Sequence, residues 1–334
     1  MKRFYKKGIS LFLILLMSFP LCACKSDDSK ALTTVKLNEV AHSIFYAPMY
    51  VAIEKGYFED EGIELSLTTG FGADKTMAAV VSEDADVGFM GTEASIYAYT
   101  EGAKDHVINF AQLTQRAGNF VVARENADSF SYEDMIGKDV LGGRAGGTPE
   151  MVYEYVLREN GVSPSEVKID QSIDFGSTAA AFSGGQGDYT IEFEPSATAL
   201  EQSGDGYVVA SIGVDSGYLP YTAFCAKESY LKENADLIQH FTNALQKGMD
   251  YVAGHSPEEI ASVIAPQFSE TDLKTLTLIV SRYYDQETWN TDLILREEGY
   301  DLMLTILEES GVLSGAAPYE DLVNTDFAEK ASTL

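Results

Sequence analysis

The chain has 334 residues, 45% of them hydrophobic, and a formal net charge of −29. So acidic a chain lacks the basic surface that nucleic acid or broad docking on anionic lipid requires, although local dipoles can still hold a small anion. A chain of this length exceeds what one hydrophobic core usually supports, which predicts two lobes.

The first 23 residues have the features of a secretory signal. Four basic residues among the first seven precede an apolar run from 9 to 19 that is too short to span a bilayer. Residues 21–24 (LCAC) then resemble the bacterial lipobox, in which the last cysteine is lipidated. We expect residues 1–23 to be removed, Cys24 to carry a lipid anchor, 24–34 to form a flexible tether, and the protein to lie at the extracytoplasmic face of the cell membrane.

Residues 35–117 are predicted to form the first part of lobe 1. Strands are expected at 35–40, 63–67, 87–90 and 107–113. Helices are expected at 47–56, up to 82 with Asp74 as its N-terminal cap, and up to 102 with Thr92 as its N-terminal cap. Strands that alternate with helices in this way are typical of βαβ units on a mostly parallel sheet.

A second alternating block, residues 118–215, is predicted to form lobe 2. Strands are expected at 120–123, 139–141, 167–169, 191–193 and 207–210, with helices at 148–161 and 178–182. Capping boxes are expected at Ser131 with Asp134 and at Ser163 with Glu166.

Residues 216–334 are predicted to return to lobe 1 and to end in a helical tail. A strand is expected at 221–226 and helices at 235–253, 257–264, 272–284 and 293–310. The predicted fold is therefore α/β with two lobes, each a mostly parallel sheet flanked by helices, and a ligand cleft between them. Three separate domains explain the pattern less well, because no linker-like segment follows residue 34.

Three aromatic side chains and one histidine lie on the loops that follow the first two predicted strands. Ligands of open α/β sheets bind at the carboxyl ends of the strands, and aromatic rings there suit planar or apolar ligands. The candidates are His42, Phe45, Tyr46 and Phe71. Packing at the lobe interface would explain one or two of them instead.

A glycine-rich loop opens the helix predicted at 148. The backbone of Gly147 and the hydroxyl of Thr148 would bind an anion, and Arg144 could add a two-pronged contact. A tight turn with a self-capping threonine explains the loop equally well. Glu192 and Glu194 share one side of a strand and can do acid–base work or accept hydrogen bonds from an amine; a solvated strand end explains this pair equally well.

No enzyme or metal motif stands out, so we expect no catalysis, no cofactor and no metal. The histidines do not pair at ligand spacing. Cys225 lies in the apolar stretch 221–226, which predicts a buried, inert thiol rather than a disulfide or metal ligand.

Short motifs connect the sequence to a known family. They are residues 46–52 (YAPMYVA), 54–58 (EKGYF), 61–65 (EGIEL), 86–89 (DVGF), 137–140 (GKDV) and 184–188 (GGQGD) with 194–195 (EP). The chain resembles, over about 35–260, the type II solute-binding proteins for sulfonates, nitrate, taurine and the thiamine pyrimidine precursor. The resemblance implies a small-molecule ligand, ABC permease and ATPase partners and hinge closure; we expect a monomer.

The resemblance also suggests two ligand classes. Anion binders of the family would use Thr92 and Thr148 here, whereas pyrimidine binders would use Phe45, Tyr46, Tyr189 and Glu192. Tyr189 departs from the alanine that the family usually has there. We favour a planar nitrogenous ligand such as a thiamine precursor; an alkylsulfonate, taurine or nitrate is the first alternative. An enzyme like the pyrimidine synthases of this fold, or a sensory lipoprotein without an importer, is the alternative of another class.

Overall fold

The computed structural model describes residues 31–126, 129–173, 175–313 and 315–334. Leu32–Leu334 form one compact unit. The predicted signal peptide, Cys24 and all but the last four residues of the predicted tether lie outside the described residues. Among the described helices, none is both long and apolar enough to cross a membrane.

The first of two five-stranded sheets has the order β2-β1-β3-β10-β4. Strand β1 pairs parallel with β2 and β3, whereas β10 runs antiparallel to β3 and β4. Strand β10 is the strand that arrives from the second sheet, and the other four are consecutive in the chain. The bounds are β1 (Thr33–Glu39), β2 (Ile63–Thr69), β3 (Val87–Met90), β4 (Val107–Thr114) and β10 (Thr222–Lys227).

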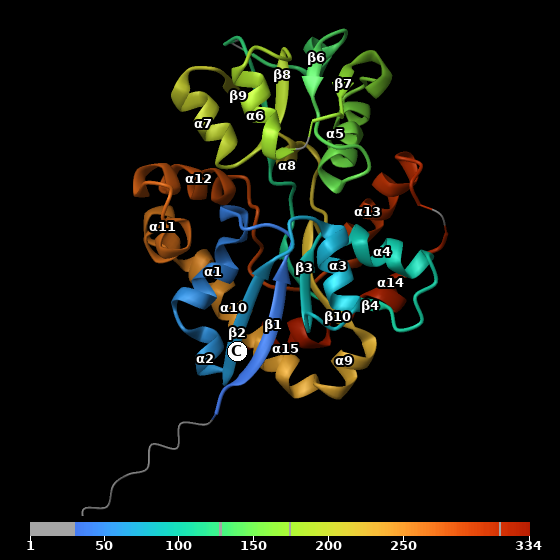
Figure 1. Cartoon of the computed structure of the whole chain (residues 1–334), viewed down its shortest axis with the longest axis vertical. Coiled ribbons are helices and arrows are strands. Elements are labelled where there is room, and N and C mark those ends of the chain that lie inside the picture. The colour runs from blue at the N-terminus through green and yellow to red at the C-terminus, as the bar shows by residue number, and fades with distance from the viewer. Residues whose placement is uncertain (1–30, 127–128, 174, 314) are drawn as a thin grey trace, which may run out of the picture. The chain divides into compact units, whose positions relative to one another are not determined.

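The second sheet repeats this arrangement, with the order β7-β6-β8-β5-β9. Strand β6 is parallel to β7 and β8, and β5 is antiparallel to β8 and β9. The antiparallel strand is again the one that follows a crossing between the sheets, here from β4. The strands are β5 (Asn119–Ala123), β6 (Asp139–Leu141), β7 (Lys168–Asp170), β8 (Tyr189–Phe193) and β9 (Tyr207–Ser211). The predicted two-lobe α/β fold with mostly parallel sheets is confirmed (Figure 1).

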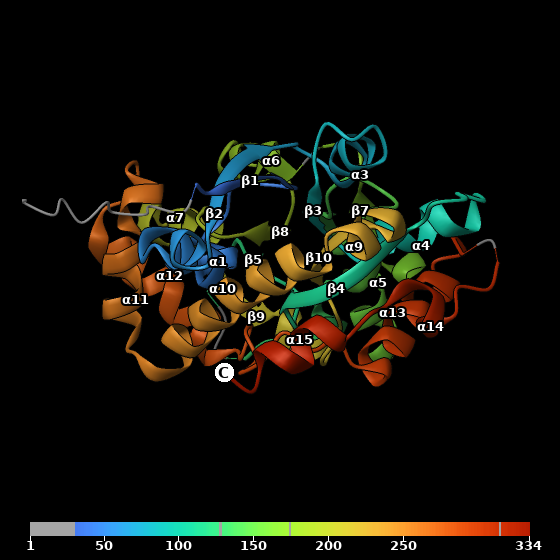
Figure 2. The same ribbon diagram turned by 90° about the horizontal axis from the view of Figure 1, so that it is seen from below.

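Helices cover both faces of the first sheet. Helix α10 packs on it through Phe241, whose ring lies 5.6 Å from Phe224 of β10, and α15 packs against β4 (Figure 2). Helix α3 lies against β3. The helices around this sheet are α1 (Ala47–Glu54), α2 (Tyr57–Asp60), α3 (Ala73–Val81), α4 (Glu93–Thr100), α9 (Glu228–Glu233), α10 (Ala235–Gly254), α14 (Tyr319–Leu322) and α15 (Asp326–Ala331).

The close approach of α10 to α1 depends on a glycine. A side chain at Gly248 would place its Cβ 2.2 Å from the carbonyl oxygen of Pro48, so any larger residue would push the two helices apart. This contact fixes α1, and with it the 3₁₀ turn η1 (Ile44–Tyr46) that precedes it.

The second sheet carries α5 (Thr148–Glu159), α6 (Phe175–Ser183), α7 (Ser196–Ser203) and α8 (Ile212–Asp215), with the 3₁₀ turns η2 (Tyr132–Met135) and η3 (Pro164–Glu166). Both predicted capping boxes are present, at Ser131 with Asp134 and at Ser163 with Glu166. The apolar pattern thus located most of the regular elements of this sheet, but it missed α7 and α8.

The tail contains α11 (Pro257–Ile264), η4 (Ala265–Phe268), α12 (Leu273–Asp285) and α13 (Glu297–Glu309). The prediction of a helix from 293 was wrong: α13 begins at Glu297. Leu293 and Leu295 are buried in an irregular segment, and the carbonyl of Leu293 accepts a hydrogen bond from the backbone of Gln112 at 2.8 Å. Their apolar spacing reflects packing beside β4 rather than a helix face.

The two predicted helix caps at Asp74 and Thr92 do not form capping hydrogen bonds, although Thr92 does occupy the N-cap position of α4. Gly72, not Asp74, occupies the N-cap of α3. Thr92 precedes α4 without a capping hydrogen bond, because its buried hydroxyl donates to the carbonyl oxygen of Pro220 at 2.7 Å. This bond ties the start of α4 to the segment that returns from the second lobe.

Candidate functional site

The first turns of two helices face each other where the lobes meet. Helix α4 follows β3 in the first lobe and begins with Glu93; helix α5 follows β6 in the second lobe and begins with Thr148. The Thr148 hydroxyl lies near the Glu93 carboxyl and favours its charged form, but the two side chains do not make a hydrogen bond of normal geometry. The carboxyl ends of strands from both sheets therefore meet at one point, which is where open α/β sheets hold their ligands.

Four polar atoms at this boundary are buried and have no hydrogen-bond partner among the described residues. They are Glu93 Oε2, Asn119 Oδ1, Thr148 Oγ1 and the hydroxyl of Tyr221, and we call these four residues the inter-lobe polar cluster. None of the four residues is more than 6% exposed. Leaving a buried polar group unpaired costs about 1–3 kcal/mol, so four together indicate a place built for a further partner.

Asn119 can be oriented from its surroundings. Its Nδ2 donates to the carbonyl oxygen of Pro149 at 3.5 Å, and a carbonyl can only accept. The amide nitrogen must therefore point at Pro149, which leaves Oδ1 as the unpaired atom. Pro149 directly follows Thr148, so this bond also joins the first residue of β5 to the start of α5.

Aromatic rings line the cluster. The ring of Phe45 in η1 lies 5.7 Å from Tyr221, 5.1 Å from Tyr283 and 6.5 Å from Phe193 of the second lobe. Tyr46 packs beside it at 5.4 Å. Phe45 thus contacts rings from both lobes.

The acidic group of the cluster resists ionisation. Burial raises the pKa of the Glu93 carboxyl, and the hydroxyl of Thr148 and a backbone N–H oppose this only in part. Burial, with the nearby charge of Glu93, also raises the pKa of Tyr46 and Tyr221, so both phenols stay neutral. A ligand that donates hydrogen bonds to Glu93 would favour its ionised form.

The comparison with protein families decides which family this is. Residues 44–260, more than half of the chain, match the family described as NMT1/THI5 like. The chain belongs to the NMT1/THI5-like family. The matched range contains the whole inter-lobe polar cluster as well as Phe45 and Tyr46. Family membership and the structural likeness below confirm the resemblance inferred from the short motifs.

Three proteins show how this NMT1/THI5-like chain relates to others. A protein of Bacillus subtilis (strain 168) that carries the name "Putative binding protein YtlA" is 43% identical over 334 residues, covering 100% of this chain and 99% of YtlA. The riboflavin-binding protein RibY of Chloroflexus aurantiacus is 27% identical over 244 residues, covering 71% of this chain and 66% of RibY. The periplasmic aliphatic sulphonate binding protein SsuA of Escherichia coli shares the fold, with a TM-score of 0.70 at 16% identity over 86% of this chain and 96% of SsuA.

The NMT1/THI5-like structure brings some of the predicted site residues to the cluster. Phe45 and Tyr46 lie beside it, Thr148 belongs to it, and Gly147 is the N-cap of the helix that Thr148 begins. Glu192 is buried on β8, one residue before Phe193, and accepts a hydrogen bond from Thr190 at 2.6 Å. Burial raises the pKa of Glu192 to about 7.

Two predicted residues of the first lobe lie apart from the cluster. His42 is held by Glu39 at 3.0 Å and by the carbonyl of Gln267 at 3.0 Å, and its hydrogen bond with Glu39 raises its pKa. Phe71 is 77% exposed on the loop after β2, with a left-handed φ of 57°.

The other predicted residues lie elsewhere. Thr92 is occupied with Pro220, as described above. Arg144 is exposed and makes no hydrogen bond or ion pair with the described residues. Tyr189 begins β8, roughly 13 Å along the strand from Phe193, and lines a surface cavity of about 440 Å³ with Phe130 and Lys138.

Sequence reasoning missed three of the four cluster members. Glu93 directly follows the candidate Thr92, just after the strand predicted at 87–90. An acidic residue in the first turn of the helix that follows this strand could therefore have been predicted as a site residue. Asn119 and Tyr221 lie at the ends of the two crossings, where β5 and β10 begin, and no motif marks them. No group of three His, Cys, Asp or Glu residues in the described ranges could hold a metal ion.

Proposed function

We propose that this chain is the solute-binding component of an ABC import system. It would capture a small planar nitrogenous compound between its lobes, at the inter-lobe polar cluster, and deliver it to a permease. The observation that carries the proposal is the set of four buried, unpaired polar atoms at the meeting point of the two sheets. Family membership and the name of the relative YtlA support a binding role.

The kinds of unpaired atom favour one class of ligand. Asn119 Oδ1 only accepts hydrogen bonds, and so does Glu93 Oε2 when it is ionised, whereas the hydroxyls of Thr148 and Tyr221 both donate and accept. A ring with N–H donors and a carbonyl or ring-nitrogen acceptor satisfies all four. The rings of Phe45 and Tyr46 supply apolar surface beside them.

A sulfonate or nitrate fits the cluster less well. Such an anion brings only acceptor atoms and a negative charge next to the carboxyl of Glu93, and it leaves Asn119 Oδ1 unpaired. It would bind the protonated form of Glu93. The likeness to SsuA keeps this class as the alternative to be tested.

The membrane side of the proposal depends on the N-terminal sequence. The LCAC motif at 21–24 supports a lipid anchor on Cys24 and an extracytoplasmic location, with the permease and ATPase subunits as partners. An enzyme is less favoured. The one thiol in the described residues, Cys225, is buried in β10, where burial raises its pKa to about 12, so it is a poor nucleophile.

Calorimetric titration of the full-length chain at pH 5.5 and pH 8 tests the proposal. The ligands are thiamine precursors, flavins, alkylsulfonates, taurine and nitrate. We expect a pyrimidine or flavin to bind more tightly at the higher pH, because its N–H groups pair with the ionised form of Glu93, which a rise in pH favours. Tighter binding of a sulfonate at pH 5.5 would establish the alternative, and binding of none of them at either pH would contradict the ligand proposal.

Two variants show whether the cluster is the site. Glu93→Gln replaces one carboxyl oxygen by a donor, so the affinity for an N–H ligand should fall at least tenfold. Glu59→Gln makes the same chemical change at an exposed position on α2 and should leave the affinity unchanged. Equal affinities in both variants would place the site elsewhere.

A further inference from the structure

Helix α12 (Leu273–Asp285) lies outside the range that the family model matches, yet it contacts both lobes. Asp272 caps it by accepting hydrogen bonds from the backbone of Lys274 and Thr275 at 3.0 and 3.1 Å. Its buried face, formed by Leu276, Ile279, Val280 and Tyr283, belongs to the main hydrophobic core. The helix packs on α11 and on η1, the turn that carries Phe45.

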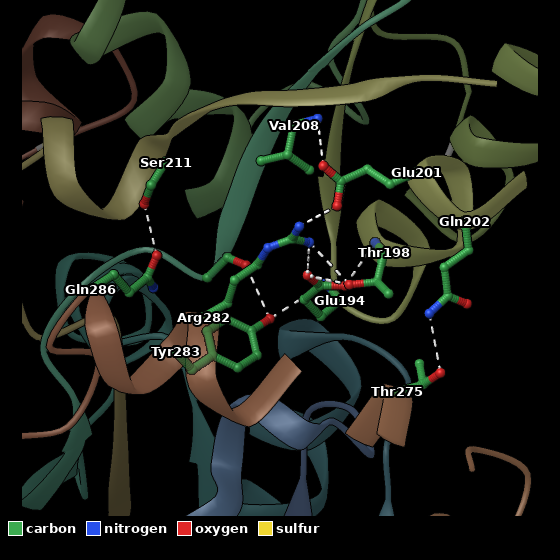
Figure 3. A network of polar contacts seen from close by, with 11 residues as sticks. Glu194, Thr198, Glu201, Gln202, Val208, Ser211, Thr275, Arg282, Tyr283 and Gln286 are labelled. Atoms are coloured by element: carbon green, nitrogen blue, oxygen red, sulfur yellow. Dashed lines mark hydrogen bonds and ion pairs between the residues drawn. The ribbon is translucent and has the colours of Figure 1, made fainter. Parts of the chain in front are cut away.

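Arg282 reaches from α12 into the second lobe. Its guanidinium binds Glu194 at 2.6 Å and Thr198 at 2.9 Å and also pairs with Glu201 of α7 (Figure 3). The Glu194 side chain has no exposed surface, so this ion pair is shielded from solvent on the acidic side. Glu194 follows β8 directly, and the contact therefore holds the junction of β8 and α7 against α12.

The next residue, Tyr283, ties α12 to the first crossing between the lobes. Its hydroxyl donates to the carbonyl oxygen of Gly118 at 3.1 Å and accepts from the backbone N–H of Glu194 at 3.4 Å. Gly118 precedes Asn119 of the inter-lobe polar cluster. The ring of Tyr283 lies 5.1 Å from Phe45, so one side chain touches the first lobe, the crossing and the second lobe.

We propose that α12 is a clasp that holds the lobes in the arrangement of this structure, in which the inter-lobe polar cluster is buried and which we call closed, with Arg282 as a positioning residue that sets ligand affinity without touching the ligand. The proposal goes beyond the proposed binding function and depends on it only for the affinity measurement. Opening the lobes would part Arg282 from Glu194 or drag α12 along. The apparent affinity of a site that exists only when closed falls with the fraction of closed molecules.

The chain's single tryptophan reports on the clasp without any ligand. Trp289 follows α12, is 9% exposed, and donates through Nε1 to the carbonyl oxygen of Phe45 at 2.9 Å. Its ring lies 6.2 Å from Tyr283. Release of α12 from the second lobe should let a small quencher reach Trp289.

The test is acrylamide quenching of the ligand-free, full-length chain. Arg282→Met keeps the length of the aliphatic stem but removes the ion pair, and should raise the quenching constant at least twofold. Arg282→Lys keeps the positive charge and should bring the quenching constant much of the way back to the wild-type value. Arg296→Met is the matched control, because Arg296 pairs with Asp292 on the same segment and, among the described residues, forms no hydrogen bond or ion pair with the second lobe. It should behave as the wild type.

The affinity measurement completes the test. For a ligand that binds the wild type, Arg282→Met should raise Kd at least tenfold and increase the dissociation rate. Arg282→Lys should recover most of the lost affinity. A lowered melting temperature with unchanged quenching and Kd would overturn the proposal and leave Arg282 a structural brace. If Arg282→Met does not fold, the double variant Arg282→Met with Glu194→Gln removes both charges and takes its place. Absence of any ligand would contradict the proposed function, whereas the quenching result would still decide the clasp.

Discussion

Tyr221 and Tyr283 pack on the same ring, that of Phe45, at 5.7 and 5.1 Å, yet their hydroxyls differ in one respect. The hydroxyl of Tyr283 has two backbone partners, and the hydroxyl of Tyr221 has none among the described residues. Both side chains are buried. The Tyr283 hydroxyl is therefore a structural group of the ligand-free protein, whereas the Tyr221 hydroxyl is available to a ligand.

This difference predicts opposite effects of the same substitution. Tyr221→Phe removes an unpaired buried hydroxyl and should raise the free energy of unfolding of the ligand-free chain by about 1 kcal/mol, while weakening ligand binding. Tyr283→Phe leaves the carbonyl of Gly118 and the N–H of Glu194 without that partner and should lower it by about 1–3 kcal/mol. Urea unfolding of both variants measures the effects, and a loss of stability in Tyr221→Phe would show that its hydroxyl is already paired.

Glu192 should make the stability of the protein depend on pH. Burial raises its pKa in the folded state from 4.5 to about 7, so the folded state keeps the proton that the unfolded chain releases. The free energy of unfolding contributed by this group therefore falls as the pH rises from 4.5 through 7, by about 3 kcal/mol in total. Glu192→Gln cannot ionise and should be more stable than the wild type by about that amount at pH 8, and equal to it near pH 4.5.

Denaturant titrations at pH 4.5 and pH 8 check this prediction. Glu59→Gln, at an exposed position, serves as the control and should show no pH-dependent difference from the wild type. If the stability difference between Glu192→Gln and the wild type is the same at both pH values, Glu192 is ionised in the folded protein at pH 8.

The sequence predicts most of the long elements because their apolar periodicity is strong. The helices at 235–253 and 257–264 were expected within one residue of α10 and α11. The direction of β5 and β10 could not be predicted, because antiparallel pairing depends on how the chain crosses between sheets. The false start at 293 has the same kind of cause: Leu293 and Leu295 are buried by packing beside β4, which local pattern cannot separate from a helix face.

The candidate site was only half predictable. Phe45, Tyr46 and Thr148 follow from the rule that ligands lie at strand ends. Asn119 and Tyr221 come together only through the crossings, and their significance is that their polar atoms lack partners, a property of the packed structure rather than of the sequence. Tyr189 has the right chemistry for a planar ligand but begins β8, whereas the cluster lies beyond the other end of that strand.

Phe71 allows ligand contact to be separated from backbone strain. Its ring is 77% exposed and its φ of 57° is a left-handed conformation that disfavours a side chain. Phe71→Ala and Phe71→Gly remove the same ring, which lies apart from the inter-lobe polar cluster, so both should leave the ligand affinity unchanged. Phe71→Gly should be more stable than Phe71→Ala by about 1 kcal/mol, because glycine adopts this φ without penalty. Calorimetric titration and thermal unfolding of the two variants measure these effects; an equal loss of affinity in both would show that the ring contacts the ligand.

The thiol content of the protein tests both the packing of β10 and the lipid anchor. Cys225 is buried with its pKa raised to about 12 by desolvation, so the folded chain at pH 8 should not react with a disulfide reagent within minutes. The sequence contains three cysteines, of which Cys22 leaves with the predicted signal peptide and Cys24 carries the predicted lipid. Protein purified from membranes and then unfolded in guanidinium should therefore release one thiol per chain. Three thiols would show that the signal peptide is retained and Cys24 unmodified, and rapid reaction of the folded chain would show that β10 is accessible in solution.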